Sequence, residues 1–412
     1  MRYLSTLFLL LIHFALSAQT IRLNERLQAH FSFDGYPISD KSGNAIQVFL
    51  QGDTTLGCGV DGSALRFDGL TSGASFFGLF DVFRQVDFTM SFYIKTNVQA
   101  GNQTFDLFSK RKSCAATDSS MVVRYTPSNN SISVELIQDS KLRHVVSQRL
   151  DQGRCWQHIV ITRTFNTLKL YVNGRLRVSN VASATKRVNI SNSGFFSISN
   201  SPCTLDKKFN GYLDELRIYD RAINEEEVQA LYVAPDQLVN RDTILYLGGT
   251  VNTRLTNTCA TIFAWNPKTD ITDANSGTTT IQPTQGGQFR YVLTMKDGQC
   301  TTLDTINVKV IDPKDLDCSK LFIPNAFTPN GNGINERFYI SNPETVDEIV
   351  SFEVLDAWGG RMYYTNEKRP IDGGWDGTFN GTAVNPQVYL WKARYKCKGQ
   401  ELSQFGSVTL IK

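Results

Sequence analysis

Turn dipeptides of the Asn-Gly and Asp-Gly type recur along the chain and separate short segments in which apolar and polar residues alternate. Asn173-Gly174, Asp297-Gly298 and Asn330-Gly331 are examples. Because Asn, Asp and Gly tolerate positive φ, such pairs favour tight turns between strands. Alternation with a period of two places one face of each strand in a core and the other in water. The pattern predicts an all-β chain.

Most of these strands lie between about residues 25 and 233. Alternating segments are expected at Phe88–Lys95, Ile159–Thr162, Leu168–Val172 and Phe209–Tyr219. Asn224, with Glu227 three residues later, has the capping-box pattern that opens a short helix. The region is therefore predicted to be a sheet-dominated unit with one terminal helix.

This succession resembles the laminin-G-like, concanavalin-type jelly roll. The resemblance rests on C-W-Q-H-I-V-I-T-R at Cys155–Arg163 and L-Y-V-N-G at Leu170–Gly174. It implies a jelly-roll sandwich with a calcium ion on one rim, held by hard oxygen donors. The implied calcium ligands are Asp34, Asp40, Asn44 and Asp214. The alternative is that Asp34-Gly35 and Asp40–Asn44 are only turns, which need the same residue types.

Two loops of this region are candidates for binding an extracellular glycan or matrix-like ligand, because binding sites on β-sandwiches tend to lie on loops. They are Asp34–Asn44 and Leu70–Phe80, and the second carries Phe76, Phe77 and Phe80. These aromatic rings offer flat apolar faces to a ligand. The alternative is core packing, since three aromatics in five positions of a strand do not all face one way.

After Pro235, which ends the helix, residues 236–310 are expected to form a smaller all-β unit. F-A-W-N-P at Phe263–Pro267, the strand around Tyr291 and Cys300 resemble the PKD-type immunoglobulin-like spacers of bacterial surface proteins. A charged linker at 312–320 precedes the last module.

The last hundred residues carry five marks in order. They are F-I-P-N-A-F-T-P-N-G-N-G-I-N-E-R-F at Phe322–Phe338, Trp358-Gly359, G-W-D-G at 374–377, V-Y-L at 388–390 and the closing strand Gly406–Lys412. Together they resemble the C-terminal sorting domain of type B cargo of the type IX secretion system, also called the gliding-motility-associated C-terminal domain. The resemblance implies a second small immunoglobulin-like sandwich, the type IX secretion machinery as a partner, and delivery outside the cell. Its sorting residues are Pro329, Asn330, Gly331, Asn332, Gly333, Trp358, Gly359, Trp375, Asp376, Gly377, Gly406 and Lys412.

Two features of the tail bear on how it could bind a metal ion or the export machinery. Asn332 and Glu336 stand where the family usually has Asp, which weakens any metal role for the turn but not the sorting role. The strand at 388–397 alternates between an apolar face and a face that becomes basic toward its end. We interpret the basic face as a solvated face or a guarded edge strand, with a recognition stripe for the export machinery as the alternative.

Composition excludes several other classes. The formal net charge is +3 over 412 residues, so neither nucleic acid nor an acidic membrane surface is implied as a partner. Residues 1–18 have the basic start, apolar run and small residues of a secretory signal peptide. No other apolar run reaches the roughly twenty residues of a membrane span.

The eight cysteines contain no C-x-x-C motif, so disulfides are the expectation for an exported chain. They sort by region, which suits domains that each close their own bridges. We predict the pairs Cys259–Cys300 and Cys318–Cys397, and the pairing among Cys58, Cys114, Cys155 and Cys203 stays open.

No metalloprotease helix, phosphate loop or nucleophile elbow occurs in the sequence. The adjacent Asp214-Glu215 point to opposite faces of a strand, so they do not make the carboxylate pair of a glycosidase. The expected organisation is a signal peptide (1–18), a laminin-G-like head (19–234), an immunoglobulin-like unit (235–312) and a sorting tail (313–412). The expected function is non-enzymatic binding or adhesion at the cell surface. The alternatives are a glycoside hydrolase on the jelly roll, or a structural surface or motility component without a ligand.

Overall fold

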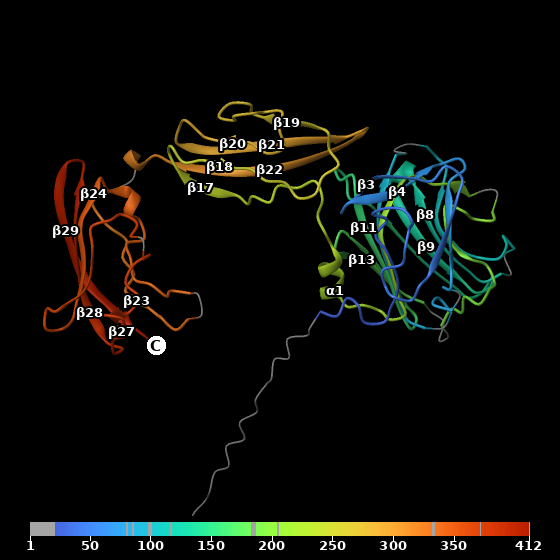
Figure 1. The fold of residues 1–412 in the computed structure, drawn as a ribbon, viewed down its shortest axis with the longest axis horizontal. Helices are drawn as coiled ribbons and strands as arrows, with labels where there is room; N and C mark the ends of the chain where they lie inside the picture. Colours follow the sequence, from blue (N-terminus) through green and yellow to red (C-terminus); the bar gives the residue numbers. More distant parts are fainter. Residues whose placement is uncertain are drawn as a thin grey trace, which may run out of the picture. The chain divides into compact units, whose positions relative to one another are not determined.

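The computed structural model describes residues 21–411, apart from 80, 85, 98–100, 116–117, 183–186, 204–205, 316, 332–333 and 371 (Figure 1). The predicted signal peptide lies outside the described residues. The described chain is almost entirely β-structure, as predicted, and three groups of strands follow one another along it.

The head consists of two antiparallel-dominated sheets that enclose one core. The first sheet has the order β13-β12-β11-β6-β16-β4-β3, with β1 paired to β16. Its strands are β1 (Leu27–Phe31), β3 (Thr55–Cys58), β4 (Ser63–Asp68), β6 (Phe88–Thr96), β11 (Gln157–Thr164), β12 (Thr167–Val172), β13 (Arg175–Val181) and β16 (Asn210–Tyr219). The predicted turn at Asn173-Gly174 joins β12 to β13, and both residues have positive φ.

The second sheet has the order β10-β9-β8-β7-β14-β5-β2, with β15 paired to β7. Its strands are β2 (Gln47–Gln51), β5 (Gly73–Phe77), β7 (Phe105–Lys110), β8 (Ser120–Thr126), β9 (Ser131–Ile137), β10 (Arg143–Arg149), β14 (Phe196–Ile198) and β15 (Lys207–Lys208). Phe92, Phe108, Ile161 and Phe196 are among the fully buried side chains between the sheets. Alternation along the strands supplies this core from one face of each sheet.

The predicted helix α1 (Glu225–Leu231) follows β16. Asn224 Oδ1 accepts from the Glu227 backbone N–H at 2.8 Å, and the Glu227 carboxylate accepts from the Asn224 N–H at 2.9 Å. This capping box satisfies two backbone donors at the helix start. Val228 and Leu231 pack against the outer face of the first sheet.

The middle strands form a four-stranded sheet with the order β17-β22-β21-β19 and a two-stranded sheet of β18 and β20. The strands are β17 (Thr243–Tyr246), β18 (Val251–Asn252), β19 (Ile262–Asn266), β20 (Thr280–Ile281), β21 (Gly287–Asp297) and β22 (Cys300–Ile311). Trp265 and Tyr291 are fully buried here. The compact unit that contains the head also includes residues 255–263 and 294–304, which are one end of these strands.

The cysteine pairing corrects one prediction. Cys259 bonds to Cys58 and Cys300 bonds to Cys155, so the predicted Cys259–Cys300 bridge is wrong. The reason is that residues 255–263 and 294–304 lie with the head, where each cysteine meets a head cysteine at a Cα–Cα distance of 5.7 Å. Cys114 bonds to Cys203, and Cys318 bonds to Cys397 as predicted.

The tail is built on one five-stranded sheet, with the order β23-β29-β28-β24-β25. Its strands are β23 (Ala326–Phe327), β24 (Glu348–Leu355), β25 (Arg361–Thr365), β28 (Val388–Cys397) and β29 (Gln400–Leu410), and β26 (Thr378–Phe379) pairs with β27 (Thr382–Ala383). Short 3₁₀ turns occur at Pro127–Asn129 (η1) in the head and at Pro313–Asp315 (η2) and Pro343–Thr345 (η3) near the tail. Because β28 lies between β24 and β29, its interpretation as an edge strand is wrong, and its basic side chains lie on the outward face of a central strand.

Candidate functional site

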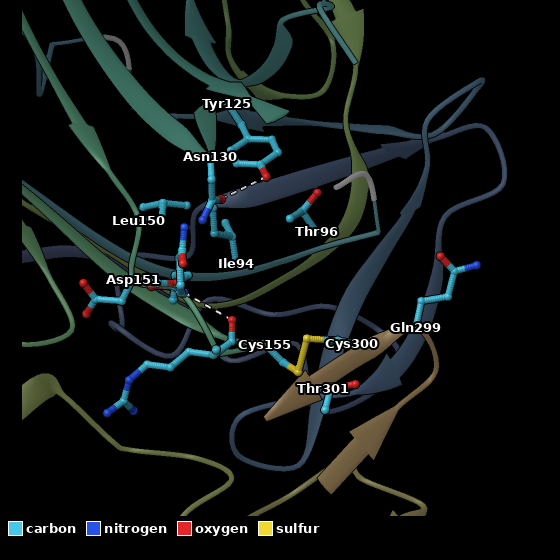
Figure 2. Close-up of a pocket in the computed structure, with 14 residues that line it drawn as sticks. Ile94, Thr96, Tyr125, Asn130, Leu150, Asp151, Cys155, Gln299, Cys300 and Thr301 are labelled. Atoms are coloured by element: carbon cyan, nitrogen blue, oxygen red, sulfur yellow. Dashed lines mark hydrogen bonds between the residues drawn. A yellow bond between two sulfur atoms is a disulfide. The ribbon is translucent and has the colours of Figure 1, made fainter. Parts of the chain in front are cut away.

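A pocket of about 360 Å³ opens at one end of the head, beside the Cys155–Cys300 bridge (Figure 2). Strands β6 and β8, the turn after η1, the loop before β11 and the start of β22 contribute to it. Its lining consists of Ile94, Thr96, Tyr125, Asn130, Leu150, Asp151, Gln152, Gly153, Arg154, Cys155, Gln157, Gln299, Cys300 and Thr301. We call it the rim pocket.

The rim pocket has an apolar floor. Ile94, Leu150 and Tyr125 belong to the core of the head and are almost fully buried. The Tyr125 hydroxyl donates to Asn130 Oδ1 at 3.1 Å, and burial raises the pKa of this tyrosine. Asn130 has positive φ, a conformation that Asn adopts more readily than most residues, so the turn after η1 holds its side chain beside Tyr125 (Figure 2).

In one wall of the pocket, the polar side chains already form hydrogen bonds with other residues of the head. The Asp151 carboxylate accepts from Arg177 at 2.7 Å and from Asn173 at 2.9 Å. Gln157 donates to the backbone carbonyls of Asp151 and Arg154 at 2.7 and 3.2 Å. These contacts fix the loop at 151–154 and leave its charged carboxylate fully engaged.

Several uncharged polar groups of the lining are available to a ligand. Asn130 Nδ2 and the side chains of Gln152, Gln299 and Thr301 make no hydrogen bond within the described part of the chain. Figure 2 shows Asn130 and Ile94 on one side of the pocket, and Thr301 with the disulfide on the other. The pocket therefore combines an apolar floor with uncharged amides and hydroxyls, while the Arg154 guanidinium of the lining donates to the Tyr232 hydroxyl at 3.2 Å.

The predicted calcium ligands fall into two places. Asp40 accepts hydrogen bonds from the His30, Ser42 and Ile46 backbone N–H groups, and Asn44 donates to the carbonyls of Leu27 and Gln28. Burial opposes ionisation of Asp40, but these hydrogen bonds outweigh it and hold its pKa below the usual value. Both side chains therefore serve the turn itself.

Asp34 and Asp214 lie against a different loop, at 59–63. Asp214 Oδ2 accepts from the Val60 N–H at 2.7 Å, while Asp34 accepts from Lys41 at 2.8 Å and from the Ser63 N–H at 3.3 Å. Burial raises the pKa of Asp214 to about 8. Among the described residues, no three acidic, histidine or cysteine side chains form a group able to hold a metal ion. In this arrangement the four residues do not form one calcium donor set, and calcium binding stays a prediction.

Two of the aromatic residues predicted to contact a ligand lie on opposite faces of strand β5, because side chains alternate along a strand. Phe76 is 1% exposed and packs against Phe31 and Phe196, so its assignment as a ligand contact is wrong and its role is in the core. Phe77 points the other way, is 39% exposed and lies 4.8 Å from the Phe195 ring, centroid to centroid. Phe80 lies outside the described residues. Ligand binding by Phe77 stays a prediction.

Sequence reasoning missed a pair of carboxylates on the outer face of the second sheet. Asp106 of β7 is 1% exposed, and its Oδ1 has no hydrogen-bond partner among the described residues. Burial, and then the nearby Asp206 carboxylate, raise the pKa of Asp106 to about 7. Asp206 accepts from Arg124 at 3.3 Å, and both aspartates line a cavity of about 210 Å³. The two residues are a hundred positions apart in sequence, so no local sequence motif predicts that they lie close together.

In the tail, the sorting residues Trp375, Asp376, Gly377 and Gly406 are held by the fold. Trp375 is buried and donates to the Thr378 carbonyl at 2.8 Å, and Asp376 accepts from the Thr378 N–H at 3.0 Å. A Cβ on Gly377 would meet Leu410 and Pro329, and a Cβ on Gly406 would meet the Trp391 ring. Trp358 differs from all of these, because it is 94% exposed.

The first sorting turn is partly described. The Asn330 N–H donates to the Thr328 carbonyl, and the Gly331 N–H donates to Glu336 at 2.9 Å. Gly331 and Gly359 have positive φ, as their turns require. Asn332, Gly333 and Lys412 lie outside the described residues. No helix of the described chain has the length and apolarity needed to cross a membrane.

A two-sheet sandwich followed by a separate β tail defines a modular all-β protein. Residues 71–229 match the family model of the concanavalin A-like lectin/glucanases superfamily, and residues 321–410 match that of the CHU_C type IX secretion signal domain. The head therefore belongs to the concanavalin A-like superfamily, and the tail is a type IX secretion signal domain. Such a tail directs the chain across the outer membrane, to the cell surface or the extracellular space.

Several solved structures are similar to the chain, each with a TM-score below 0.5. Domain 4 of AbnA, a GH43 extracellular arabinanase from Geobacillus stearothermophilus in complex with arabinotriose, is 22% identical, with a TM-score of 0.40, over 50% of this chain and 98% of that one. The receptor binding domain of a botulinum neurotoxin C/D mosaic serotype is 12% identical, with a TM-score of 0.45, over 92% and 73%. The Ruminococcus gnavus IT-sialidase CBM40 is 16% identical, with a TM-score of 0.32, over 37% and 85%. No curated protein matches the chain.

Proposed function

We propose that this protein is a non-enzymatic glycan-binding protein of the cell surface or extracellular space, and that its head binds an uncharged sugar unit in the rim pocket. The observation that carries the proposal is a set of uncharged polar groups above the buried Ile94 and Leu150: Asn130 Nδ2 and the side chains of Gln299 and Thr301, which make no hydrogen bond within the described part of the chain. Export by the tail supports it, because the head is then delivered to where extracellular glycans are.

The lining matches the chemistry of a sugar. Amide and hydroxyl groups donate to and accept from sugar hydroxyls, while the C–H face of a pyranose or furanose ring suits the apolar floor. The carboxylate in the wall, Asp151, is already paired with Arg177, so it offers little attraction to a cationic ligand. An uncharged glycan is the ligand class that these groups favour.

The disulfide prepares the pocket for binding. Cys155–Cys300 holds the start of β22 against the loop before β11, and Lys95 of β6 forms an ion pair with Asp297 at the end of β21. Gln299 and Thr301 therefore sit on backbone that is fixed on both sides. Prior fixing of contact groups lowers the entropy lost on binding.

A glycan array with the full chain tests the proposal. Uncharged glycans should bind, and Gln299→Ala combined with Thr301→Ala should weaken binding of the strongest by about five- to 150-fold, since each of the two lost neutral hydrogen bonds contributes about 0.5–1.5 kcal/mol. Gln400→Ala is the matched control, because Gln400 follows Lys398-Gly399 in the tail hairpin as Gln299 follows Asp297-Gly298. An array with no bound glycan at high protein concentration would favour the structural component without a ligand.

The carboxylates of the outer face favour a second candidate function, glycoside hydrolysis. Asp106 and Asp206 are two carboxylates in different environments, and such a difference separates an acid from a base or nucleophile. If the head is a hydrolase, an array-selected glycan is cleaved by the wild-type chain and not by Asp106→Asn. If it is a binder, the glycan is recovered intact from both.

A further inference from the structure

Among the sorting residues that the structure describes, Trp358 lacks the structural role that the others have. Trp375 fills the core, and Gly377 and Gly406 allow close packing against Leu410 and the Trp391 ring. Trp358 contributes nothing comparable, since 94% of its surface faces water. A large aromatic side chain with no packing role is the kind of residue that dominates protein interfaces.

The turn that carries Trp358 is held firmly. Asp356 Oδ1 accepts from the Trp358 N–H at 2.9 Å and from the Gly360 N–H at 2.7 Å. The Asp356 N–H donates to the Gly360 carbonyl at 2.8 Å, and Gly359 adopts positive φ. The indole is therefore presented on a preorganised backbone, which lowers the entropic cost of its burial by a partner.

The sheet beside this turn presents further apolar surface. Leu355, the last residue of β24, pairs with Leu390 of the central strand β28, and Lys392 in the next outward row pairs with Phe405 of β29. Val388, Leu390 and Phe405 are 53%, 49% and 81% exposed. Side chains of this kind on the outward face of a central strand indicate a face that becomes covered.

The charge on this face is mixed with a small positive excess, since Arg361, Lys392, Arg394 and Lys396 share it with Glu348, Glu353 and Glu401. Arg394 and Lys396 are paired with Glu401 and Glu348, but Lys392 has no ion pair among the described residues. Arg361 begins β25 and lies 5.1 Å from the Tyr364 ring. Lys392 and Arg361 are thus available to carboxylates of a partner.

We propose that Trp358 and the outward face of β28 and β29 form the docking surface of the tail for a protein of the type IX export machinery, whose surface offers an apolar pocket for the indole and acidic groups opposite Lys392 and Arg361. The proposal rests on the assignment of the tail as the type IX secretion signal. It extends that assignment by naming the surface of the tail that the export machinery contacts. A protein of the export machinery is favoured over a second copy of this chain because the tail matches the type IX secretion signal domain.

The test is the export of full-length variants in a host with a type IX secretion system. Trp358→Ala, and separately Leu390→Asp with Phe405→Asp, should lower the exported amount about tenfold or more and leave the chain in the periplasm, since interface anchors typically cost at least a factor of ten. Phe379→Ala is the matched control, because Phe379 is also an exposed aromatic residue of the tail, at 42%, but lies on β26, outside the five-stranded sheet. Thermal unfolding of each purified variant shows whether the tail still folds.

A deletion of residues 322–412 distinguishes failure of the docking surface from failure of the sorting assignment. If the deletion abolishes export while the folded Trp358 and Leu390/Phe405 variants are exported at wild-type levels, the docking surface is wrong and the sorting assignment stands. If the deleted chain is still exported, the sorting assignment itself is wrong. If light scattering shows a wild-type dimer that Trp358→Ala converts to a monomer with export unchanged, the face is a self-association surface instead.

Discussion

Asp106 carries a testable consequence for stability. Its pKa of about 7 in the folded chain lies above the ordinary value of 3.8, chiefly because of burial. The folded state therefore retains a proton that the unfolded state loses, and stability falls as pH rises from about 4 through 7. Each unit of pKa difference corresponds to about 1.4 kcal/mol, so the loss is at most about 4 kcal/mol.

Asp106→Asn should gain stability relative to the wild-type chain as pH rises, and the difference should widen by up to about 3 kcal/mol between pH 5 and pH 8, because the amide carries no charge to bury. Urea unfolding of both chains at the two pH values measures the difference. Asp139→Asn is the control, because Asp139 is a solvent-exposed turn residue on the same sheet. A stability gap that is equal at pH 5 and pH 8 would contradict the assigned pKa.

Asp214 allows the calcium prediction to be tested. Calorimetric titration of Ca²⁺ into the full chain should show binding that Asp214→Ala abolishes if the predicted ligand set is real. Ser42→Ala is a useful companion, since Ser42 donates to the Asp40 carboxylate without belonging to the set. Binding heat that Asp214→Ala leaves unchanged would remove this metal site.

At the scale of single residues, the sequence predicted residue types better than their surroundings. The alternating period of a strand shows that Phe76 and Phe77 face opposite ways, but it does not say which of them faces the core. That choice depends on the neighbouring Phe31 and Phe196, which come from distant strands. The same limit hid the rim pocket, whose lining joins β6 to the start of β22.

At the scale of elements, the Cys155–Cys300 disulfide of the head gives the next prediction. Removing Cys155–Cys300 by changing both residues to Ser should lower the free energy of unfolding by about 2–4 kcal/mol, because the bridge closes a long loop. It should also weaken glycan binding, since the bridge holds Gln299 and Thr301 in the rim pocket. Denaturant unfolding and the array measure the two effects.

The pair Cys318→Ser with Cys397→Ser is the control for this prediction. It removes a bridge of the tail and should leave glycan binding intact. Equal loss of binding in both double variants would contradict the role given to the rim pocket.

Local signals were sufficient for most elements. The Asn173-Gly174 hairpin and the capping box of α1 depend only on neighbouring residues, and both are present as predicted. The Cys259–Cys300 pairing was wrong because it assumed that sequence regions and packed units coincide. Disulfide partners depend on which strands meet in space, and residues 255–263 and 294–304 meet the head.

At the scale of the whole molecule, the family motifs anticipated a concanavalin-type head and a sorting tail, and both are confirmed by family matches. Motifs of this kind reflect packing requirements, such as the space that Gly406 leaves for Trp391, so they identify a fold more readily than a ligand. The ligand depends on side chains such as Asn130 and Gln299, which belong to no motif.

The central claim is that export places a glycan-binding head outside the cell. The most direct measurement is capture of the exported protein, from the medium and the cell surface, on beads that carry the strongest glycan of the array. Wild-type protein and Gln400→Ala should be captured equally. Gln299→Ala with Thr301→Ala should be exported normally but captured at least about threefold less. The chain lacking residues 322–412 should be absent from both fractions. Undiminished capture of the exported rim-pocket variant would contradict the account.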